Sequence, residues 1–324
     1  MAFKTKVKVL GVFLLLIVIA LGIWYFSLSK TPVTIVIQRG DSASKAAAML
    51  KNNNIIYSRN LFMIWTRITG SGSKIKAASY EFSQRDMTIG ILSQIKNPKI
   101  IPLRMTIPEG LTSKQIAEIA ASKLAIDKDK FINIVNERKL EGYLLPETYF
   151  LDATFKEEDI INKLNNEFNK AITQEMKDKA QELGFSLRDI IILASVIEKE
   201  AVKPDERAVI SSVFHNRLKK GVKLESCATV LYAMGIVKPR LTYEDIKYDS
   251  PYNTYIHAGL PPGPICNPGI ESIIAALYPA DTDKLFFVAS GDGGHLFANG
   301  FKQHVENKKI ANDNAVKKKR AGKK

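Results

Sequence analysis

The sequence holds few of the residues that cross-link small exported proteins or bind metal ions. Its 324 residues include only two cysteines, Cys227 and Cys266, and four histidines. Two cysteines exclude a fold built on a disulfide scaffold, so a chain of this length must rely on hydrophobic cores. In an oxidising compartment the two cysteines either form one bridge or remain as two buried, unpaired thiols.

Motifs of several other protein classes are also missing. No two of the histidines, His215, His257, His295 and His304, share helical spacing with a carboxylate in the arrangement of a zinc site, so we expect no metal and no other cofactor. No Gly-x-Ser-x-Gly elbow presents a serine nucleophile. The chain has neither a nucleic-acid-binding motif nor an internal repeat, which argues against a nucleic-acid partner and a repeat array.

The formal net charge of +14 is concentrated at the two ends of the chain. Lys4, Lys6 and Lys8 precede the first hydrophobic segment, and six lysines and arginines lie within 317–324. Terminal runs of like charge are usually solvated. The pattern therefore predicts a basic disordered tail over 311–324 rather than a surface that binds nucleic acid.

A long apolar segment, residues 9–29, carries no charge. As a helix it is long enough to cross a bilayer core of about 30 Å. The lysines before it should keep residues 1–8 in the cytoplasm, so that the chain after Lys30 is exported. A cleaved signal peptide is the alternative, because 20–22 are small residues, but the apolar run continues through 23–26. We predict a single-pass anchor in the cell inner (cytoplasmic) membrane, with the remainder on the periplasmic or extracytoplasmic side.

Residues 30–98 show the pattern of a small separate module. Apolar and polar residues alternate over 31–38, which predicts a half-buried strand. The spacing of apolar residues predicts two helices and then a strand and a third helix, over 42–53, 58–68, 80–83 and 89–95. This order resembles a LysM-like glycan-binding module.

Residues 99–310 predict a larger α+β domain, so that the exported chain contains a pair of domains and is of α+β class. We expect strands at 100–107 and 285–289. Helical patterns start at Thr112 and cover 127–137, 157–183, 186–201 and 204–221. The segment 141–149 is too rich in turn formers and aromatic residues to be only a connector.

Glu200 stands out within the helix predicted over 186–201. Ser186 is a candidate N-cap, with Asp189 as the partner of a partial capping box. At about 100° per residue, one side of the helix gathers Ile190, Leu193, Val196 and Ile197, and the other gathers Ser195, Glu198 and Lys199. Glu200 falls on the apolar side. Burial would raise the pKa of its carboxyl and leave an acid able to donate a proton near neutral pH. Alternatively, Glu200 leans into solvent or pairs with Lys199.

The C-terminal region of the chain holds several loop motifs rich in proline, glycine, tyrosine and asparagine. They are 252–255, 260–265, 267–269 and 293–297. Rigid turns that present tyrosine and asparagine suit a groove that binds sugar, since aromatic faces stack on rings and amides bond hydroxyl or N-acetyl groups. The alternative is a long loop with a structural role alone.

These motifs carry a resemblance to a known family. The segments are Leu193–Glu200, Asp205–Arg207, Val213–Leu218, Tyr252–Tyr255, Leu260–Gly269 and Gly293–His295, the last followed by Phe297. In their order and spacing, over about 31–308, they resemble the endolytic murein transglycosylases, the MltG or YceG-like family. The predicted membrane helix and LysM-like module match that family as well.

The resemblance implies an enzyme that cleaves the β-1,4 bond between N-acetylmuramic acid and N-acetylglucosamine in nascent peptidoglycan strands. It implies 1,6-anhydro product ends, termination of strand elongation, and peptidoglycan synthases as partners. The family's catalytic glutamate matches Glu200, which the helix pattern selects independently. Glu200 would protonate the glycosidic oxygen and then accept a proton from the muramic 6-hydroxyl. No second carboxylate is identified as a nucleophile, in contrast to the hydrolase scheme with two carboxylates.

The resemblance also suggests supporting residues, each of which has a structural alternative. Candidate substrate-binding residues are Asn216, Arg217, Tyr252, Asn253, Tyr255, Asn267 and His295. Candidate carboxylates that support the site from behind are Glu147, Glu198 and Glu225.

One segment departs from the family pattern. Where the family commonly has Leu-Gln-Thr/Ser-Asp-Pro-Thr-Val, this chain places Cys227 and Ala228 at the aspartate and proline positions. Glu225 is a candidate source of the missing charge, and Cys227 and Cys266 are a candidate disulfide. The departure keeps open a non-catalytic, membrane-anchored glycan-binding scaffold. A hydrolase that uses water, leaving reducing ends, is a third possibility.

Overall fold

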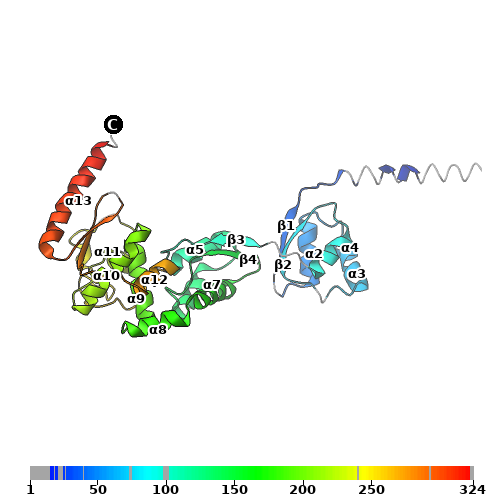
Figure 1. Cartoon of the computed structure of the whole chain (residues 1–324). Helices are drawn as coiled ribbons and strands as arrows, with labels where there is room; N and C mark the ends of the chain where they lie inside the picture. Colours follow the sequence, from blue (N-terminus) through cyan, green and yellow to red (C-terminus); the bar gives the residue numbers. More distant parts are fainter. Residues whose placement is uncertain are drawn as a thin grey trace, which may run out of the picture. The chain divides into compact units, whose positions relative to one another are not determined.

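The computed structural model describes residues 15–17, 19–20, 25, 27–38, 40–72, 75–97, 102–238, 241–291 and 293–321. The chain divides into two compact units (Figure 1). The first unit comprises Met1–Leu103 and Phe150–Phe155, and the second comprises Arg104–Tyr149 and Lys156–Lys324.

The first unit pairs two strands with three helices. In chain order the elements are β1 (Val33–Ile37), α2 (Ala43–Asn52), α3 (Arg59–Ile68), β2 (Ala78–Phe82) and α4 (Thr88–Lys96). β1 and β2 are antiparallel, with Val33 opposite Phe82 and Ile37 opposite Ala78. The predicted order of strand, two helices, strand and helix is confirmed.

The core of the first unit follows from the alternation in β1 and the helical spacing that succeeds it. Ile35 and Ile37 point inward from β1 and are buried together with Leu50 of α2 and Phe62 of α3. Burying side chains of this size is the main favourable contribution to folding. Local caps set the helix starts: the Ser42 hydroxyl, for example, accepts a hydrogen bond from the Lys45 N–H.

The second unit contains most of the helices. Its elements and those at its border are β3 (Leu103–Thr106), α5 (Ser113–Lys123), α6 (Lys128–Glu137), β4 (Thr148–Leu151), α7 (Glu157–Ala171), α8 (Gln174–Glu182), α9 (Leu187–Glu200), the 3₁₀ helix η1 (Pro204–Glu206), α10 (Arg207–Lys219), α11 (Cys227–Met234), the 3₁₀ helix η2 (Asp245–Lys247), α12 (Ile270–Leu277), β5 (Phe286–Ala289), β6 (His295–Ala298) and α13 (Phe301–Ala321). β3 pairs with β4, and β5 pairs with β6 in antiparallel register. The unit is thus α+β, as predicted.

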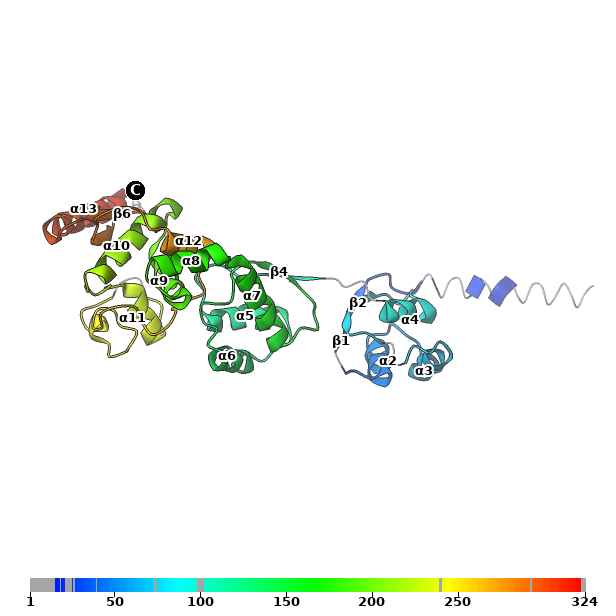
Figure 2. The ribbon, with the colours of Figure 1, turned by 60° about the horizontal axis from the view of Figure 1, so that its bottom comes forward.

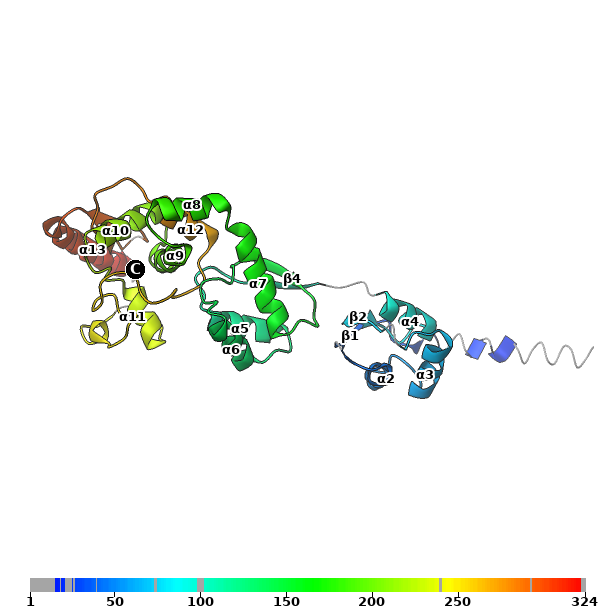
Figure 3. The same ribbon diagram turned by 90° about the horizontal axis from the view of Figure 1, so that it is seen from below.

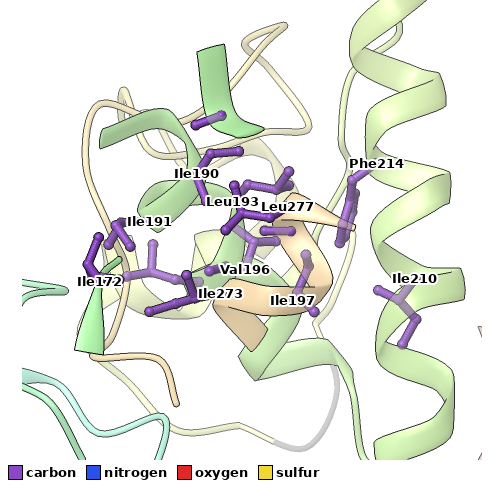
Figure 4. Close-up of a cluster of buried hydrophobic side chains, with 14 of the residues drawn as sticks. Ile172, Ile190, Ile191, Leu193, Val196, Ile197, Ile210, Phe214, Ile273 and Leu277 are labelled. Carbon is purple, nitrogen blue, oxygen red and sulfur yellow. The ribbon is translucent and has the colours of Figure 1, made fainter. Parts of the chain in front are cut away.

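Helix α9 is the centre of the second unit. It packs against α8, α10, α11 and α12, which surround it in Figures 2 and 3. Figure 4 shows its side chains among those of α10 and α12, with Leu193 and Val196 close to Ile273 and Leu277. Ser186 caps the helix and forms a full capping box with Asp189.

The structure corrects the expected polar side of this helix. Every residue from Ile190 to Ile197 is buried, including Ser195. The Ser195 hydroxyl donates to the carbonyl of Ile192 at 2.7 Å and accepts from the N–H of Ile265 at 3.0 Å. A small hydroxyl with both functions satisfied can be buried at little cost. α9 is therefore a central helix, and its C-terminal residue is delivered to the interior of the unit.

Other predictions need correction at element boundaries. The single helix expected over 157–183 is two helices, α7 and α8, separated by a break at which the Thr173 hydroxyl accepts from the Met176 N–H. Helix α13 continues to Ala321, so the disorder expected over 311–324 is wrong for 311–321. Residues 322–324 lie outside the described residues.

The predicted anchor, 9–29, lies mostly outside the described residues. Within the portion of the chain that the structure describes, no helix has both the length and the apolar character needed to cross a membrane.

Candidate active site

A cleft of about 660 Å³ lies in the second unit at the C-terminal end of α9. Side chains of α5, α6, α9 and α11 line it, together with residues of the connecting loops. Polar groups from both sides of the cleft include Asn136, Glu141, Lys199 and Glu200, and the ring of Tyr232 also faces it. Concave sites with a few convergent polar groups are the usual form of ligand-binding sites.

Glu200, the last residue of α9, presents its carboxyl to this cleft. The Ser226 hydroxyl donates to Oε1 at 2.5 Å, and the backbone N–H of Ala228 donates as well. Burial raises the pKa of Glu200, and this effect outweighs the hydrogen bonds and the nearby His295, which lower it. The predicted inward orientation is confirmed. Pairing with Lys199 is not observed, since that ammonium donates to the carbonyl of Gly110 at 3.2 Å.

A small hydroxyl network holds Ser226 in place. The Ser226 N–H donates to Thr254 Oγ1 at 3.1 Å, and the Thr229 hydroxyl donates to the Ser226 carbonyl at 2.8 Å. The hydroxyls of Thr229 and Thr254 are 2.9 Å apart. All three side chains are buried, so the donor to Glu200 is fixed before any ligand arrives. Sequence reasoning did not select Ser226, although it lies beside the altered Cys227–Ala228 segment.

The two cysteines are free, and the hypothesis that they form a disulfide is wrong. Cys227, at the start of α11, lines the cleft, and its Sγ is 3.1 Å from the Tyr255 hydroxyl. Cys266 is buried beneath α9, where its thiol donates to the carbonyl of Ser195 at 3.3 Å. Burial raises the pKa of both thiols. The two thiols thus have different partners, the Tyr255 hydroxyl for Cys227 and the main chain of α9 for Cys266.

Tyr252 and Tyr255 come from the predicted aromatic loop but take different positions. Tyr255 reaches the Glu200 region through its hydroxyl contact with Cys227. Tyr252 packs its ring against Tyr232, with centroids 5.0 Å apart, and Tyr232 lines the cleft. Sequence reasoning missed Tyr232, because its position on α11 becomes relevant only when that helix folds against α9.

Three of the predicted substrate-binding residues direct their polar atoms to the main chain. Asn253 donates to the carbonyls of Ile246 and Tyr248 at 2.9 and 2.8 Å and accepts from the Tyr255 N–H at 2.9 Å. Asn216 donates to two carbonyls of the 282–284 segment, at 2.8 and 3.0 Å. The contacts of Asn253 and Asn216 fit their structural alternative, the positioning of loops.

Arg217 is the third of these residues. Its guanidinium donates to the carbonyls of Leu285, Lys223 and Leu224 at 2.6, 2.9 and 3.0 Å. It also forms an ion pair of 2.9 Å with Glu225. Glu225 therefore neutralises Arg217, and its role as a source of the family's missing charge stays a prediction.

Asn267 joins the other wall of the cleft. Its Oδ1 accepts from the N–H groups of Gly142 and Leu144 at 3.0 and 2.9 Å, and its Nδ2 donates to Leu111 and Glu141. The site of Gly142 admits no side chain, because a Cβ there would lie 2.5 Å from Pro264 and the residue has φ +88°. Asn267 thus ties the 141–144 turn to the Pro-rich loop.

Glu141 is a second, largely buried carboxyl that lines the cleft, and sequence reasoning did not place it in the site. It accepts from the N–H of Ser113 at 3.1 Å and from Asn267 Nδ2 at 3.0 Å. Burial raises its pKa to about 7, although these hydrogen bonds lower it. Its place at the head of the turn-rich segment 141–149 was the signal that pointed to it.

The remaining candidates lie around the site in different ways. Glu198 accepts from the Gly269 N–H at 3.1 Å and the Ser272 hydroxyl at 2.7 Å, so it anchors the start of α12 to α9. Glu147 is exposed, and its carboxylate accepts from the N–H of the next residue, at 2.8 Å. His295 is held by Glu206, with Nδ1 2.7 Å from the carboxylate, and lies close enough to Glu200 to lower its pKa.

No group of three metal-ligating side chains gathers anywhere in the described residues. The polar groups at the cleft include the acid Glu200 with its hydroxyl donor Ser226, the Lys199 ammonium and the tyrosine ring of Tyr232. Such a site can deliver a proton to a substrate oxygen and take one back.

Comparison with known proteins places this arrangement in a family. The profile of the YceG-like family matches residues 35–310. The endolytic murein transglycosylase of Bacillus subtilis (strain 168) is 35% identical over 303 residues, which cover 85% of this chain and 84% of that protein. The chain belongs to the YceG-like family, and the resemblance inferred from its motifs is confirmed.

Two further proteins support the assignment. The endolytic murein transglycosylase of Streptococcus pneumoniae serotype 2 (strain D39) is 25% identical over 325 residues, covering 86% of this chain and 58% of that protein. A crystal structure of a yceG-like protein from Listeria monocytogenes matches with a TM-score of 0.58 and 32% identity. It covers 86% of this chain and 99% of that one.

Proposed function

We propose that this protein is an endolytic lytic transglycosylase of peptidoglycan and that Glu200 is its catalytic acid and base. The observation that carries the proposal is the partly buried Glu200 carboxyl, which contacts Ser226 and opens to the cleft. The relatives named endolytic murein transglycosylase support it from sequence.

The raised pKa of Glu200 sets the first step. In its protonated form the carboxyl donates a proton to the oxygen that links N-acetylmuramic acid to N-acetylglucosamine, and that oxygen leaves as the 4-hydroxyl of the glucosamine unit. The resulting carboxylate then accepts the proton of the muramic 6-hydroxyl, whose oxygen attacks the anomeric carbon. The product end is 1,6-anhydro-muramic acid, no water is consumed, and Glu200 is protonated again.

Ser226 and Ala228 stabilise the charged form of Glu200 that this cycle requires. Both donate to the carboxyl, and such donors favour its charged form. They stabilise the carboxylate that exists between the two proton transfers, when burial alone would make it costly. The network of Thr229 and Thr254 keeps the Ser226 hydroxyl in position through the reaction.

Substrate recognition rests on the other groups of the cleft. The ring of Tyr232, backed by Tyr252, suits stacking on a sugar face. The Lys199 ammonium lines the cleft one residue from Glu200 and suits the carbonyl oxygen of the muramic lactyl group as a hydrogen-bond acceptor. Asn136 on the facing wall suits an N-acetyl group.

The cellular setting follows from the sequence pattern. We infer that 9–29 anchors the chain in the inner membrane with both units on the extracytoplasmic side, and that the first unit acts as a LysM-like glycan-binding module. A membrane-bound enzyme that cuts internally would meet strands as they are made, beside the synthases, and would terminate their elongation.

The deciding experiment is mass spectrometry of products from uncrosslinked glycan strands, using the full chain in detergent and its Glu200→Gln variant. Internal cuts with 1,6-anhydro ends from the wild type alone are expected. Reducing ends would indicate a hydrolase. Binding of strands without cleavage by either protein would contradict the enzyme and favour the scaffold.

A further inference from the structure

Helix α3 of the first unit carries an exposed apolar stripe. Leu61, Ile64, Trp65 and Ile68 are 53%, 48%, 38% and 69% exposed, while Phe62 on the opposite side is buried in the core. Their spacing of three and four residues puts the four side chains on one face. A contiguous exposed apolar surface on a small unit indicates a site of contact with a membrane or with another molecule.

The charges near the stripe are of one sign. Within α3 the only charged residues are Arg59 and Arg67, and the helix contains no acid. Just before it, Tyr57 is 83% exposed, with the ammonium of Lys51 5.7 Å from the centre of its ring. An apolar face with a tryptophan, flanked by tyrosine and cations, is the composition of helices that lie in the head-group region of a bilayer. Anionic lipids attract such cations.

The start of the described chain ties this unit to the apolar segment 9–29. β1 begins at Val33, four residues after Ser29, a distance of at most about 14 Å along an extended chain. The Arg85 guanidinium donates to the carbonyl of Leu28 at 3.0 Å, and the Ser29 N–H donates to Gln84 at 3.1 Å. The end of the segment is thereby fastened to the turn between β2 and α4.

Helix α3 lies next to α4, which begins directly after that turn, as Figures 1 and 2 show. A bilayer that holds 9–29 would therefore lie near the side of the first unit that carries α4 and its neighbour α3. A second copy of the chain or a soluble partner would have to compete with this tethered surface, whose effective concentration is far higher.

We propose that the α3 stripe, Leu61, Ile64, Trp65 and Ile68, lies in the head-group interface of the membrane that anchors the chain. This inference rests on the membrane anchoring proposed above. With the stripe in the interface, the first unit is bound to the membrane surface and does not reorient freely. Its orientation is then fixed relative to the surface at which new glycan emerges.

The two tryptophans allow a direct test, because Trp65 lies in the stripe and Trp24 lies in the predicted anchor. The full chain is reconstituted into vesicles of phosphatidylethanolamine and phosphatidylglycerol that carry spin-labelled lipid. In Trp24→Phe, Trp65 is the only tryptophan, and we expect blue-shifted emission with stronger quenching by a label near the head group than by one near the chain end. In Trp65→Phe, Trp24 reports anchoring alone.

The outcomes separate the stripe from the anchor. If Trp24 is quenched and Trp65 is not, the proposal is overturned and the anchor stands; if neither is quenched, both fail. Emission of Trp65 that is blue-shifted but insensitive to labelled lipid means that protein covers the stripe, which also overturns the proposal. In the Trp24→Phe background, Ile64→Asp should abolish quenching. Tyr243→Asp, at a position 83% exposed in the second unit, should leave it unchanged.

Discussion

The two walls of the cleft each bury a carboxyl, and their difference shows how one physical effect produces two kinds of acid. Burial raises the pKa of both Glu200 and Glu141. Glu141 accepts from a fixed backbone N–H and from the buried amide of Asn267, which ties it to the framework. Glu200, at the end of a central helix, also accepts from a backbone N–H, that of Ala228, but its side-chain donor is the hydroxyl of Ser226. The first arrangement suits structure and binding, and the second suits proton transfer.

The most direct test of the different roles of Glu200 and Glu141 is to replace each carboxyl by its amide. Glu200→Gln should lower strand cleavage by about 10³-fold or more, because positioned acid–base groups typically contribute 10²–10⁴-fold and one residue serves both steps. Rates of product formation, measured by mass spectrometry, would check this. The unfolding midpoint should not fall, since the amide removes a buried ionisable group. Cleavage within about tenfold of wild type, against the range typical of such groups, would contradict the assignment.

Glu141→Gln should act mainly on stability and its pH dependence. The pKa of Glu141 is raised from 4.5 to about 7 in the folded state, so the folded state binds more protons than the unfolded state between these values. Its contribution to stability is therefore greatest at low pH and is lost as pH rises toward 7, by about 3 kcal/mol in all. The variant should lack this loss.

Urea denaturation of both proteins at about pH 5 and about pH 8 would measure this effect, since linkage predicts a difference only across that window. Relative to the wild type, Glu141→Gln should be more stable at the higher pH than at the lower. An equal difference at both values would show that the pKa of Glu141 is not raised. A loss of cleavage as large as that of Glu200→Gln would remove the distinction between the two walls.

Ser226→Ala should produce a smaller, diagnostic change. The hydroxyl stabilises the carboxylate of Glu200, so its loss should raise the pKa of Glu200 further. Hydrogen bonds to charged groups are worth about 1.5–3 kcal/mol, so the alkaline limb of the pH–rate profile should move up by about one to two pH units. Thr229→Val, which disturbs the same network without touching Glu200, should shift it less. Movement of that limb to lower pH would refute the role given to Ser226.

The smallest effect is expected at Cys227. Cys227→Ala removes only the contact with Tyr255, so cleavage should change by no more than a few-fold, about 1 kcal/mol. Thiol counting under native conditions should find Cys227 reactive and Cys266 protected until the protein unfolds, because Cys266 is fully buried. If no thiol were titratable even after unfolding, the hypothesis of a disulfide between Cys227 and Cys266 would be supported.

Much of the fold could be predicted from local patterns. The alternation over 31–38 and the helical spacing that follows correspond to β1, α2 and α3. The Ser186 cap and the inward position of Glu200 were also accessible, because they depend on residues within one helix. The break between α7 and α8 was not: the apolar period continues through it, and only a threonine cap marks the second start.

Most of the site could not be predicted in this way. Asn216, Arg217 and Asn253 have the residue types of a sugar-binding groove, yet their hydrogen bonds hold the main chain. Tyr232 has no local feature that sets it apart, and Glu141 stands out only as the first residue of the turn-rich segment 141–149, yet both line the cleft.

By itself, the sequence determined the order of the elements, the family, and the choice of Glu200 as a carboxyl turned inward, since periodicity and capping act over a few residues. The tertiary structure alone decided that Ser226 meets Glu200, that Glu141 lies in the same cleft, and that Cys227 and Cys266 remain free with different partners. These pairings join residues far apart along the chain, and packing around one buried helix brings them together or keeps them apart.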